Sequence, residues 1–437
     1  MVINRAEAAH LLRRAAMGAT TPQIDSFVGM TREAAVDRLF DLSVTPALPF
    51  WRRFDSGEQD WQAQEKMIEW WVDRMITSAP TIEEKLTIFW HGHFATAREK
   101  VEDARLMWDQ HRVLRSRGRG DFRQLLGEIS FGSAMMIYLD NETNVAGAEQ
   151  ENFARELMEL FTLGNGRFSE DDVIAMAKAW TGHNTVGATR ENNWVYDPTY
   201  VFKADEHDNS QKRLFGITRN WDADDTLDEI CTGSQAGVMS DFIARKMFQF
   251  YVHTNPSQGV VDELAAGFRN SGLNNSALLR SILLHDEFWA PHSRYALVKS
   301  PVEFMVDMMR RTGLRSTDDS VRWRMEGMGM TLFDPPTVAG WGQNDFWLST
   351  ATTWAKNRMT NNYKWQAADR NILQNLDGLS DSEVVDRILV HYSIFEVSDR
   401  TRTHMQELIA SVREERPWAI DFEPFALGLF APEVQCA

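Results

Sequence analysis

Cysteine is nearly absent from this sequence of 437 residues, because Cys231 and Cys436 are the only two. Two cysteines this far apart exclude a disulfide framework and a thiolate metal site. Proline is also scarce, at 13 residues, which leaves room for long uninterrupted helices. No run approaches the roughly 18 apolar residues that a membrane-spanning helix needs. The start of the chain lacks the features of a signal peptide, since Arg5, Arg13 and Arg14 interrupt every apolar run there. These absences predict a soluble, cytoplasmic protein.

Positive charge is in deficit as well. Lysine and arginine number 46 against 63 aspartate and glutamate residues, which gives a formal net charge of −17. Such a surface repels nucleic-acid phosphates and anionic lipid, so we expect neither nucleic acid nor membrane as a partner. With 43% hydrophobic residues, the chain can bury a large core. Its length suits two or three domains or one large helical body.

Helix signals recur along most of the chain. Three stretches combine an N-cap residue with an acidic residue three positions later, namely Thr81 with Glu84, Ser169 with Asp172, and Ser300 with Glu303. The third also has Pro301 at the first helical position and Gly313 after the last. Alternation typical of strands is confined to about residues 193–203, and residues 183–236 form the longest stretch poor in helix signals. We therefore predict a mainly α fold, one large multi-helix domain over residues 1–437 with at most a small β-hairpin and a long irregular segment at 183–236.

The stretch ENFARELMELFTLGNG (151–166) places Asn152, Glu156 and Glu159 on one stripe of a helix, next to an apolar arc. One interpretation is a solvated helix face. The other is a polar stripe directed into a cavity, as helical carboxylate metal sites require. In that second case Asn152 would contact the substrate.

The stretch FWHGHF (89–94) contains two histidines separated by one glycine. In a continuous α-helix, His91 and His93 would point about 200° apart and could not reach one ion. If the helix ended at Gly92 and the chain became extended, the two imidazoles could converge. The alternative is that one histidine caps the helix and the other packs against aromatic neighbours.

A polar loop, KADEHDNSQKRLFG (203–216), places His207 beside Asp208. An imidazole and a carboxylate without helix constraints suit a functional site on a loop. A solvated loop without such a role is the alternative.

The stretch GWGQNDFWLSTATTWAKN (340–357) combines Trp341 and Trp347 with the amide of Asn344. Aromatic rings with interleaved amides suit a platform for a small-molecule or peptide ligand. They also suit a corner held together by aromatic packing alone.

Several of these stretches together resemble the bacterial DUF1800 proteins, a domain family of unknown function. The resemblance runs in order through HLLRRAAMGAT (10–20), FWHGHFAT (89–96), YLDNETN (138–144), ENFARELMELFTLG (151–164), DDVIAMAKAWTGHN (171–184), HDNSQKRLFG (207–216), DFIARKMFQFYV (241–252), LVKSPVEFMV (297–306) and DPPTVAGWGQNDFWLSTATTWAKN (334–357). It covers nearly the whole chain, but no reaction comes with the family. This sequence departs from the family pattern in two ways. Many members look secreted and often carry an export signal, whereas none is seen here, and the usual GWPGG turn of the family reads GWGQN in this chain. The resemblance implies that the polar blocks belong to one site.

We therefore favour an enzyme of unassigned reaction class with a histidine–carboxylate pocket. The predicted catalytic residues are Glu156, Glu159 and His207, and the predicted metal ligands are His91, His93, Glu156, His207 and Asp208. Imidazole with carboxylate suits zinc, iron or manganese. If this pocket exists, His91 or His93 lies within direct or one-water reach of Glu156 or His207. Two alternatives stay open, a non-catalytic binding or assembly protein with a buried polar network and a metal-free acid–base enzyme.

Overall fold

The computed structural model of the chain describes residues 2–42, 60–186, 199–318, 320–370, 372–373 and 375–437. The protein is 64% helical, and the two sheets in these ranges have only two short strands each. The prediction of a mainly α fold is therefore confirmed. Within the same ranges, no helix is both long and apolar enough to cross a membrane.

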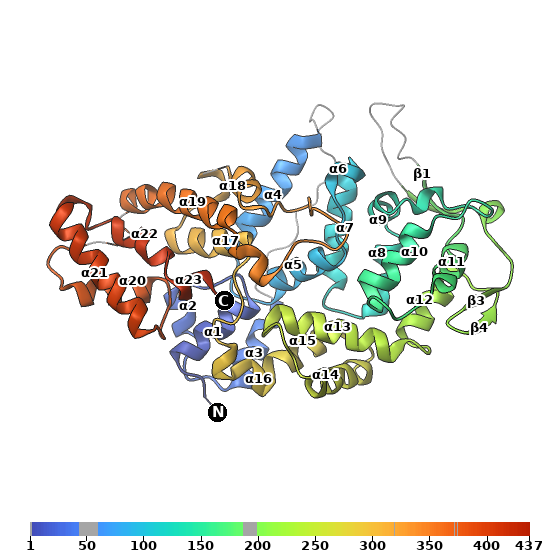
Figure 1. Cartoon of the computed structure of the whole chain (residues 1–437), viewed down its shortest axis with the longest axis horizontal. Helices are drawn as coiled ribbons and strands as arrows, with labels where there is room; N and C mark the ends of the chain where they lie inside the picture. The colour runs from blue at the N-terminus through green and yellow to red at the C-terminus, as the bar shows by residue number, and fades with distance from the viewer. Residues whose placement is uncertain (1, 43–59, 187–198, 319, 371, 374) are drawn as a thin grey trace.

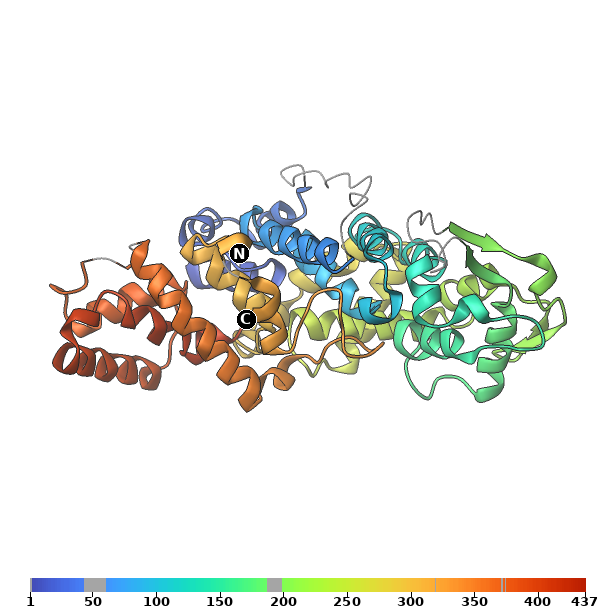
Figure 2. The same cartoon turned by 90° about the horizontal axis from the view of Figure 1, so that it is seen from above.

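The elements follow one another along an elongated body (Figures 1 and 2). The first third of the chain forms α1 (Arg5–Ala15), α2 (Thr21–Asp25), α3 (Arg32–Leu39), α4 (Asp60–Thr77), α5 (Glu83–His93), α6 (Arg98–Val101), α7 (Ala104–Arg117), α8 (Phe122–Ser130) and α9 (Ser133–Tyr138). The middle forms η2 (Asn141–Thr143), α10 (Glu151–Glu156), the π-helix η3 (Leu157–Thr162), α11 (Glu170–Ala179), β1 (His183–Val186), β2 (Thr199–Phe202), η4 (Ala204–Glu206), β3 (Lys212–Leu214), β4 (Ile217–Arg219), α12 (Ala223–Cys231), α13 (Ala236–Tyr251), α14 (Gln258–Asn270), α15 (Asn275–Leu284), α16 (Asp286–Trp289) and η5 (Pro291–Ser293). The last part forms α17 (Pro301–Thr312), η6 (Ser316–Asp318), α18 (Val321–Met328), η7 (Asn344–Leu348), α19 (Thr350–Asp369), α20 (Asp381–His391), α21 (Asp399–Glu415), η8 (Pro417–Ala419), α22 (Glu423–Leu429) and α23 (Pro432–Gln435).

Different secondary-structure elements form the two ends of the body. Helices α20, α21 and α22 form one end, and the hairpins with α11 and α12 form the other (Figure 1). Helix α5 lies between them, and both chain termini lie in this central part of the molecule (Figures 1 and 2).

The described parts of the segment 183–236, residues 183–186 and 199–236, contain more regular structure than the sequence predicted. Strand β1 pairs antiparallel with β2, and β3 pairs antiparallel with β4, so the described part contains two hairpins where one was predicted. Residues 193–198 of the predicted strand region lie outside the described residues. The second hairpin turns at Phe215 and Gly216, which both have positive φ, as a type I′ turn requires. Because phenylalanine is not a usual residue for such a turn, and the strands have three residues each, the pattern gave little sign of this hairpin. Helix α12 lies in the same segment.

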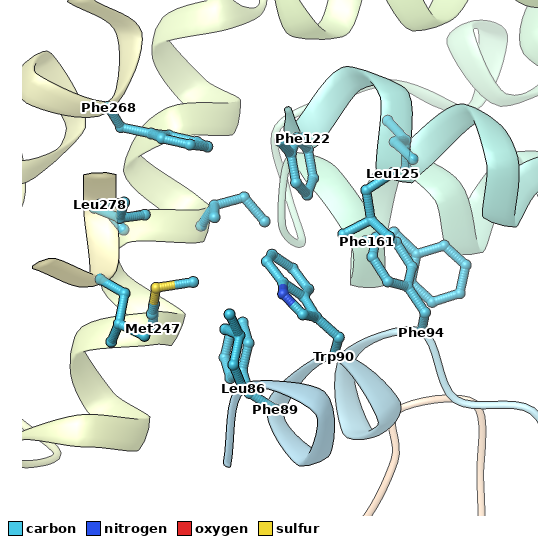
Figure 3. Packing of buried hydrophobic residues seen from close by; sticks show 14 of the residues in the cluster. Leu86, Phe89, Trp90, Phe94, Phe122, Leu125, Phe161, Met247, Phe268 and Leu278 are labelled. Atoms are coloured by element: carbon cyan, nitrogen blue, oxygen red, sulfur yellow. The ribbon is translucent and has the colours of Figure 1, made fainter. Parts of the chain in front are cut away.

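The buried apolar side chains form two clusters that share α5. Leu86 and Trp90 of this helix belong to the cluster built with α1–α3 and α8–α16, and Ile88 belongs to the one built with α4, α7 and α17–α22. Figure 3 shows Trp90 between Phe122 and side chains from the neighbouring helices of the first cluster. Phe250 packs against both clusters. Helix α5 therefore lies where the two cores meet, which places the FWHGHF stretch at the centre of the protein.

The predicted helix starts at Ser169 and Ser300 are confirmed. Each side chain caps the helix and the acidic residue three positions later completes the box, as Glu303 does for Ser300. Gly313 ends α17 in the left-handed conformation, with φ of 69°. These signals depend on neighbouring residues only, which is why the sequence alone revealed them.

The predicted cap at Thr81 is wrong. Helix α5 begins at Glu83, without a side-chain cap. The carboxylate of Glu84 is instead buried and accepts hydrogen bonds from Arg74 at 2.8 Å and from Arg115 at 2.9 Å. Two guanidinium groups from other helices thus use the carboxylate that the capping box would have needed.

Candidate functional site

Helix α5 carries His91 and His93 to opposite sides. The helix continues through Gly92 and ends at His93, so the break at Gly92 that convergence of the two imidazoles requires does not occur. Residues two apart on a helix differ in direction by about 200°. The ring of His91 contacts Trp341, with centroids 5.2 Å apart, whereas that of His93 contacts Phe161 at 6.1 Å. The two imidazoles therefore do not converge on one ion.

Gly92 borders open space and approaches a second glycine. A Cβ atom on Gly340, whose φ is +82°, would lie 2.3 Å from the carbonyl oxygen of Gly92, so that position requires glycine. A Cβ atom on Gly92 itself would meet no heavy atom within 4 Å. The glycine between the histidines thus lies at the edge of a cavity and does not break the helix.

His93 stabilises the π-helix η3. Its Nε2–H donates to the carbonyl of Phe161 at 3.0 Å, and the ammonium of Lys246 donates to the carbonyl of Leu160 at 3.4 Å. A π-helix interrupts the regular hydrogen-bond ladder, so side chains that satisfy its carbonyls stabilise it. Burial, reinforced by Lys246, lowers the pKa of His93 well below its usual value, which keeps the ring neutral. The three sequence blocks containing His93, Phe161 and Lys246 are thus joined by structural hydrogen bonds.

His91 lies in an aromatic environment. Its Nε2 accepts a hydrogen bond from the backbone N–H of Phe333 at 3.0 Å, and burial lowers its pKa to about 3. The ring of Trp71 contacts both His91 and His111. Sequence reasoning missed His111, which is buried and whose two ring nitrogens have no hydrogen-bond partner within the described ranges. His91 thus serves as an acceptor for a backbone group in a dry aromatic cluster.

The stripe of Asn152, Glu156 and Glu159 faces solvent in part. Asn152 is exposed and donates to the carboxylate of Asp140 at 3.4 Å. Glu156 is half-buried, and this burial together with the nearby charge of Glu159 raises its pKa. Glu159 accepts a hydrogen bond from Asn165 at 3.4 Å. In the described part of the chain, no hydrogen bond or ion pair joins either glutamate to a histidine.

Hydrogen bonds to Thr181 and within the loop fix the position of His207 and Asp208. Nδ1–H of His207 donates to the carbonyl of Thr181 at 2.9 Å, and the backbone N–H of Asp208 donates to the hydroxyl of Thr181 at 2.8 Å. The Asp208 carboxylate accepts from the N–H of Ser210 at 2.7 Å. Burial alone would raise the pKa of Asp208, but these bonds and the charge of Lys212 lower it. The arrangement fixes the loop on the end of α11.

The five predicted metal ligands are therefore spread over the protein. Across the described ranges, no three of them bring donor atoms within 4.8 Å of one another. No direct hydrogen bond links His91 or His93 to Glu156 or His207 in these ranges. The catalytic and metal-binding roles of these residues stay predictions, and a single site built from them would need a different arrangement.

Three of the four predicted substrate-binding residues come together, whereas Asn152 is not among the residues that line their cavity. Trp341, Asn344 and Trp347 line one cavity of about 250 Å³, to which α5 contributes Lys85 and Gly92. Its complete lining is Arg14, Lys85, Ile88, Phe89, Gly92, Gln249, Phe250, Thr254, Leu297, Val298, Ser300, Glu303, Met330, Trp341, Gly342, Gln343, Asn344, Trp347 and Ala437. The walls combine apolar and aromatic side chains with several polar and charged ones, a mixture that can both bind and orient a ligand.

Two of the predicted residues offer different chemistry to this cavity. Trp341 is buried, and among the described residues its Nε1–H has no hydrogen-bond partner, which is uncommon for a buried donor. The amide of Asn344, in contrast, is engaged, since its oxygen accepts from the backbone N–H of Val298 at 2.7 Å.

The cavity also contains a buried ion pair that sequence reasoning missed. Lys85 is 3% exposed, and its ammonium contacts the Oε1 atom of Glu303. The other oxygen, Oε2, accepts the N–H of Ser300 at 2.9 Å as part of the capping box of α17. Burial, with the charges of Arg14 and Lys299, lowers the pKa of Lys85 well below its usual value, while the contacting carboxylate favours the charged form. The capping box thus positions a carboxylate next to a desolvated amine.

A signal for Lys85 was present in the sequence. On a helix, positions 85, 88, 89 and 92 share one face, and Ile88 and Phe89 make that face apolar. A lysine on the apolar face of an amphipathic helix is unusual because burial of its charge is costly. This position could have been named as a candidate.

Comparisons with known proteins give one result. A family model described as a protein of unknown function (DUF1800) matches residues 10–436. Among curated proteins and solved structures, none matches the chain. Since the matched region is nearly the entire sequence and includes α5, the π-helix and the cavity segment at 340–347, the chain belongs to the DUF1800 family.

Proposed function

We propose that the protein is an enzyme that binds a small organic molecule in the cavity around α5. The Lys85–Glu303 pair would remove a proton from this molecule and return one to it. The observation that carries this proposal is the buried amine–carboxylate contact on the wall of the cavity. Titratable groups that are perturbed by burial and lie in a cleft are common at active sites.

The chemistry follows from the two groups in contact. A lysine whose pKa is lowered by burial loses its proton more readily than an exposed lysine and can act as a general base. Glu303 can hold that proton and return it. Trp341 lines the same cavity, and its ring can pack against an apolar part of the ligand. Lys85 is buried, and burial strengthens the interaction of a charged group with developing charge.

The size of the cavity limits the ligand. At about 250 Å³ it lies just below the roughly 300–1,000 Å³ of pockets for drug-sized molecules, so a small molecule suits it better than a peptide. The exposed residues Thr254 and Gln343 mark its polar, solvent-facing side.

The proposed acid–base site lies elsewhere than the one predicted from the sequence. The pair Lys85–Glu303 replaces Glu156, Glu159 and His207 as the proton-transfer groups. Trp341, Asn344 and Trp347 stay as ligand-binding residues. The cytoplasmic location and the exclusion of nucleic acid and membrane as partners rest on the sequence and stay predictions.

A second candidate is a binding protein that uses the same cavity without catalysis. One observation favours it, because Lys85 and Glu303 neutralise each other and Glu303 is further fixed by the N–H of Ser300. Such a pair can serve as a rigid recognition element for a polar ligand.

Binding is tested by filling the cavity. A set of small organic acids, aldehydes and ketones is screened against the protein by thermal shift and by tryptophan fluorescence. Gly92→Leu places a side chain where a Cβ atom meets open space, so we expect the responding compounds to lose their effect. Gly267→Leu in α14 is the matched control, since its Cβ also meets nothing within 4 Å and it lies outside the cavity. Responses that persist in the Gly92 variant would place the binding elsewhere.

Catalysis is tested with the compounds that bind. Each is incubated with the protein in deuterium oxide, and exchange of its C–H protons is followed by NMR. We expect exchange with the wild type and with Lys212→Met, another buried lysine remote from the cavity. Lys85→Met should abolish it. Binding without exchange in the wild type would favour the non-catalytic candidate.

A further inference from the structure

We propose that His253, Glu287 and His292 form a binding site for a divalent metal ion of the zinc class. One ligand atom from each residue lies within 4.8 Å of the other two, and in the described part of the chain this is the only group of three or more potential ligands that meets the criterion. The site shares no residue with the ligands predicted from the sequence, and it is independent of the Lys85–Glu303 pair.

The present contacts hold the three side chains around a common point. Nε2 of His292 donates to Oε2 of Glu287 at 2.8 Å, and Nε2 of His253 approaches the same oxygen at 3.4 Å. The centroids of the two imidazole rings are 5.4 Å apart. Both nitrogens thus face one carboxylate oxygen, and a cation placed between the three groups would replace these hydrogen bonds with coordination bonds.

Arg14 ties together the two segments that carry the histidines. Its buried guanidinium donates from Nη2 to the carbonyl of Val252 at 2.6 Å and to the carbonyl of Ser293 at 2.8 Å. Val252 directly precedes His253, and Ser293 directly follows His292. One rigid side chain therefore fixes the separation of the two histidine-bearing segments, as a preorganised site requires.

The carboxylate is supported in a similar way. Glu287 lies in α16, and its own carbonyl accepts a hydrogen bond from the hydroxyl of Ser293 at 2.5 Å. The carbonyl of the next residue, Phe288, accepts from Nε2–H of the buried His10 at 2.8 Å. Backbone bonds on both sides of the site limit the movement of Glu287 relative to His292. Such supporting contacts are typical of metal sites.

The donor set suits a particular class of ion. Two imidazoles and one carboxylate favour zinc and its neighbours in the first transition series over calcium or magnesium, which prefer oxygen ligands. Three protein ligands leave coordination positions for water. The side chain of His292 is 62% exposed and that of His253 is 16% exposed, so an ion can enter from solvent on the His292 side.

Metal binding has a cost that can be stated. Nδ1 of His253 accepts a hydrogen bond from the backbone N–H of Asn255 at 3.3 Å, which places the ring proton on Nε2. Coordination through Nε2 moves this proton to Nδ1, so the long bond from Asn255 is lost. The competing state is the metal-free triad, in which Glu287 pairs with both histidines by hydrogen bonds alone.

Titration of the full chain with metal distinguishes the two states. The purified protein is stripped with a chelator, dialysed, and titrated with zinc chloride by calorimetry and with cobalt chloride by visible absorption. We expect one ion per chain and the d–d bands of a cobalt ion bound to nitrogen and oxygen. His292→Gln and Glu287→Gln should each weaken binding at least about ten-fold, as loss of groups at metal sites does. Because His292 is exposed, its variant is expected to fold.

The control is His404→Gln, which changes an exposed histidine in α21. It should bind both ions like the wild type. Absence of saturable binding to the wild type would overturn the proposal. Binding that is unchanged in the His292 and Glu287 variants would also overturn it, because the ion would then lie elsewhere.

Discussion

Replacement of Glu84 by glutamine tests the buried ion network at the start of α5. The carboxylate accepts hydrogen bonds from Arg74, Arg115 and the indole N–H of Trp71, and its side chain is only 4% exposed. The glutamine keeps the size of the side chain but removes its charge, so two buried guanidinium groups lose their main counter-charge. Removal of one partner from a buried ion pair costs about 3–5 kcal/mol. We expect the free energy of unfolding to fall by this amount in urea denaturation followed by far-UV circular dichroism.

The pH dependence of this effect has a definite sign. Burial alone would raise the pKa of Glu84, but Arg115 and Arg74 together lower it. The stabilising effect is therefore complete above the unfolded value of about 4.3 and is lost as the pH falls through the lower folded value. Glu83→Gln is the control, since this glutamate contacts the same arginines with a more exposed side chain, and we expect a smaller loss. A loss below about 1 kcal/mol for Glu84→Gln, the scale of a surface pair, would refute the reasoning.

Two further predictions concern the histidines of α5. Burial lowers the pKa of His91 to about 3 in the folded protein, whereas the unfolded value is about 6.5. Between these two pH values the unfolded chain binds a proton that the folded chain does not bind. The free energy of unfolding should therefore fall by about 1.4 kcal/mol for each unit by which the pH decreases. His91→Gln should show a shallower decline in urea titrations from pH 7 to pH 4, and an unchanged slope would contradict a buried neutral ring. His93→Leu removes the donor to the carbonyl of Phe161 and should cost about 1–3 kcal/mol. Hydrogen exchange of the π-helix amides should rise in this variant, and unchanged exchange would show that the bond does not stabilise the segment.

Helix ends could be predicted from the sequence wherever neighbouring residues determine them. The box at Ser300 and the left-handed Gly313 involve partners within a few positions, so the sequence contained the complete interaction. The box at Thr81 failed because Arg115, 31 residues later, takes the carboxylate of Glu84. No local pattern indicates such a distant competitor.

The candidate site was accessible to sequence reasoning in part. Trp341 and Trp347 were named as a ligand platform, and they line the cavity. His207 was named for its chemistry, but the same imidazole serves a backbone carbonyl in the structure. Residue type alone cannot separate these uses, since a histidine satisfies a carbonyl and a ligand with the same ring nitrogen. Lys85 was missed because composition places lysine on the surface, and only its position on an apolar helix face indicated otherwise.

The π-helix gives the chain a helical segment that holds one extra residue. Leu163 N–H bonds to the carbonyl of Met158, five residues earlier, so the segment 157–162 contains one residue more than an α-helix of the same extent. Deletion of Glu159, whose side chain is half-buried, would let the ladder close as a regular α-helix. The residues after the deletion would then keep their direction, whereas a deletion from a regular α-helix turns everything after it by about 100° about the helix axis. The deletion would instead remove the widened turn in which the carbonyl of Phe161 accepts from His93. A one-codon deletion at this position is therefore milder than the same deletion in a neighbouring α-helix.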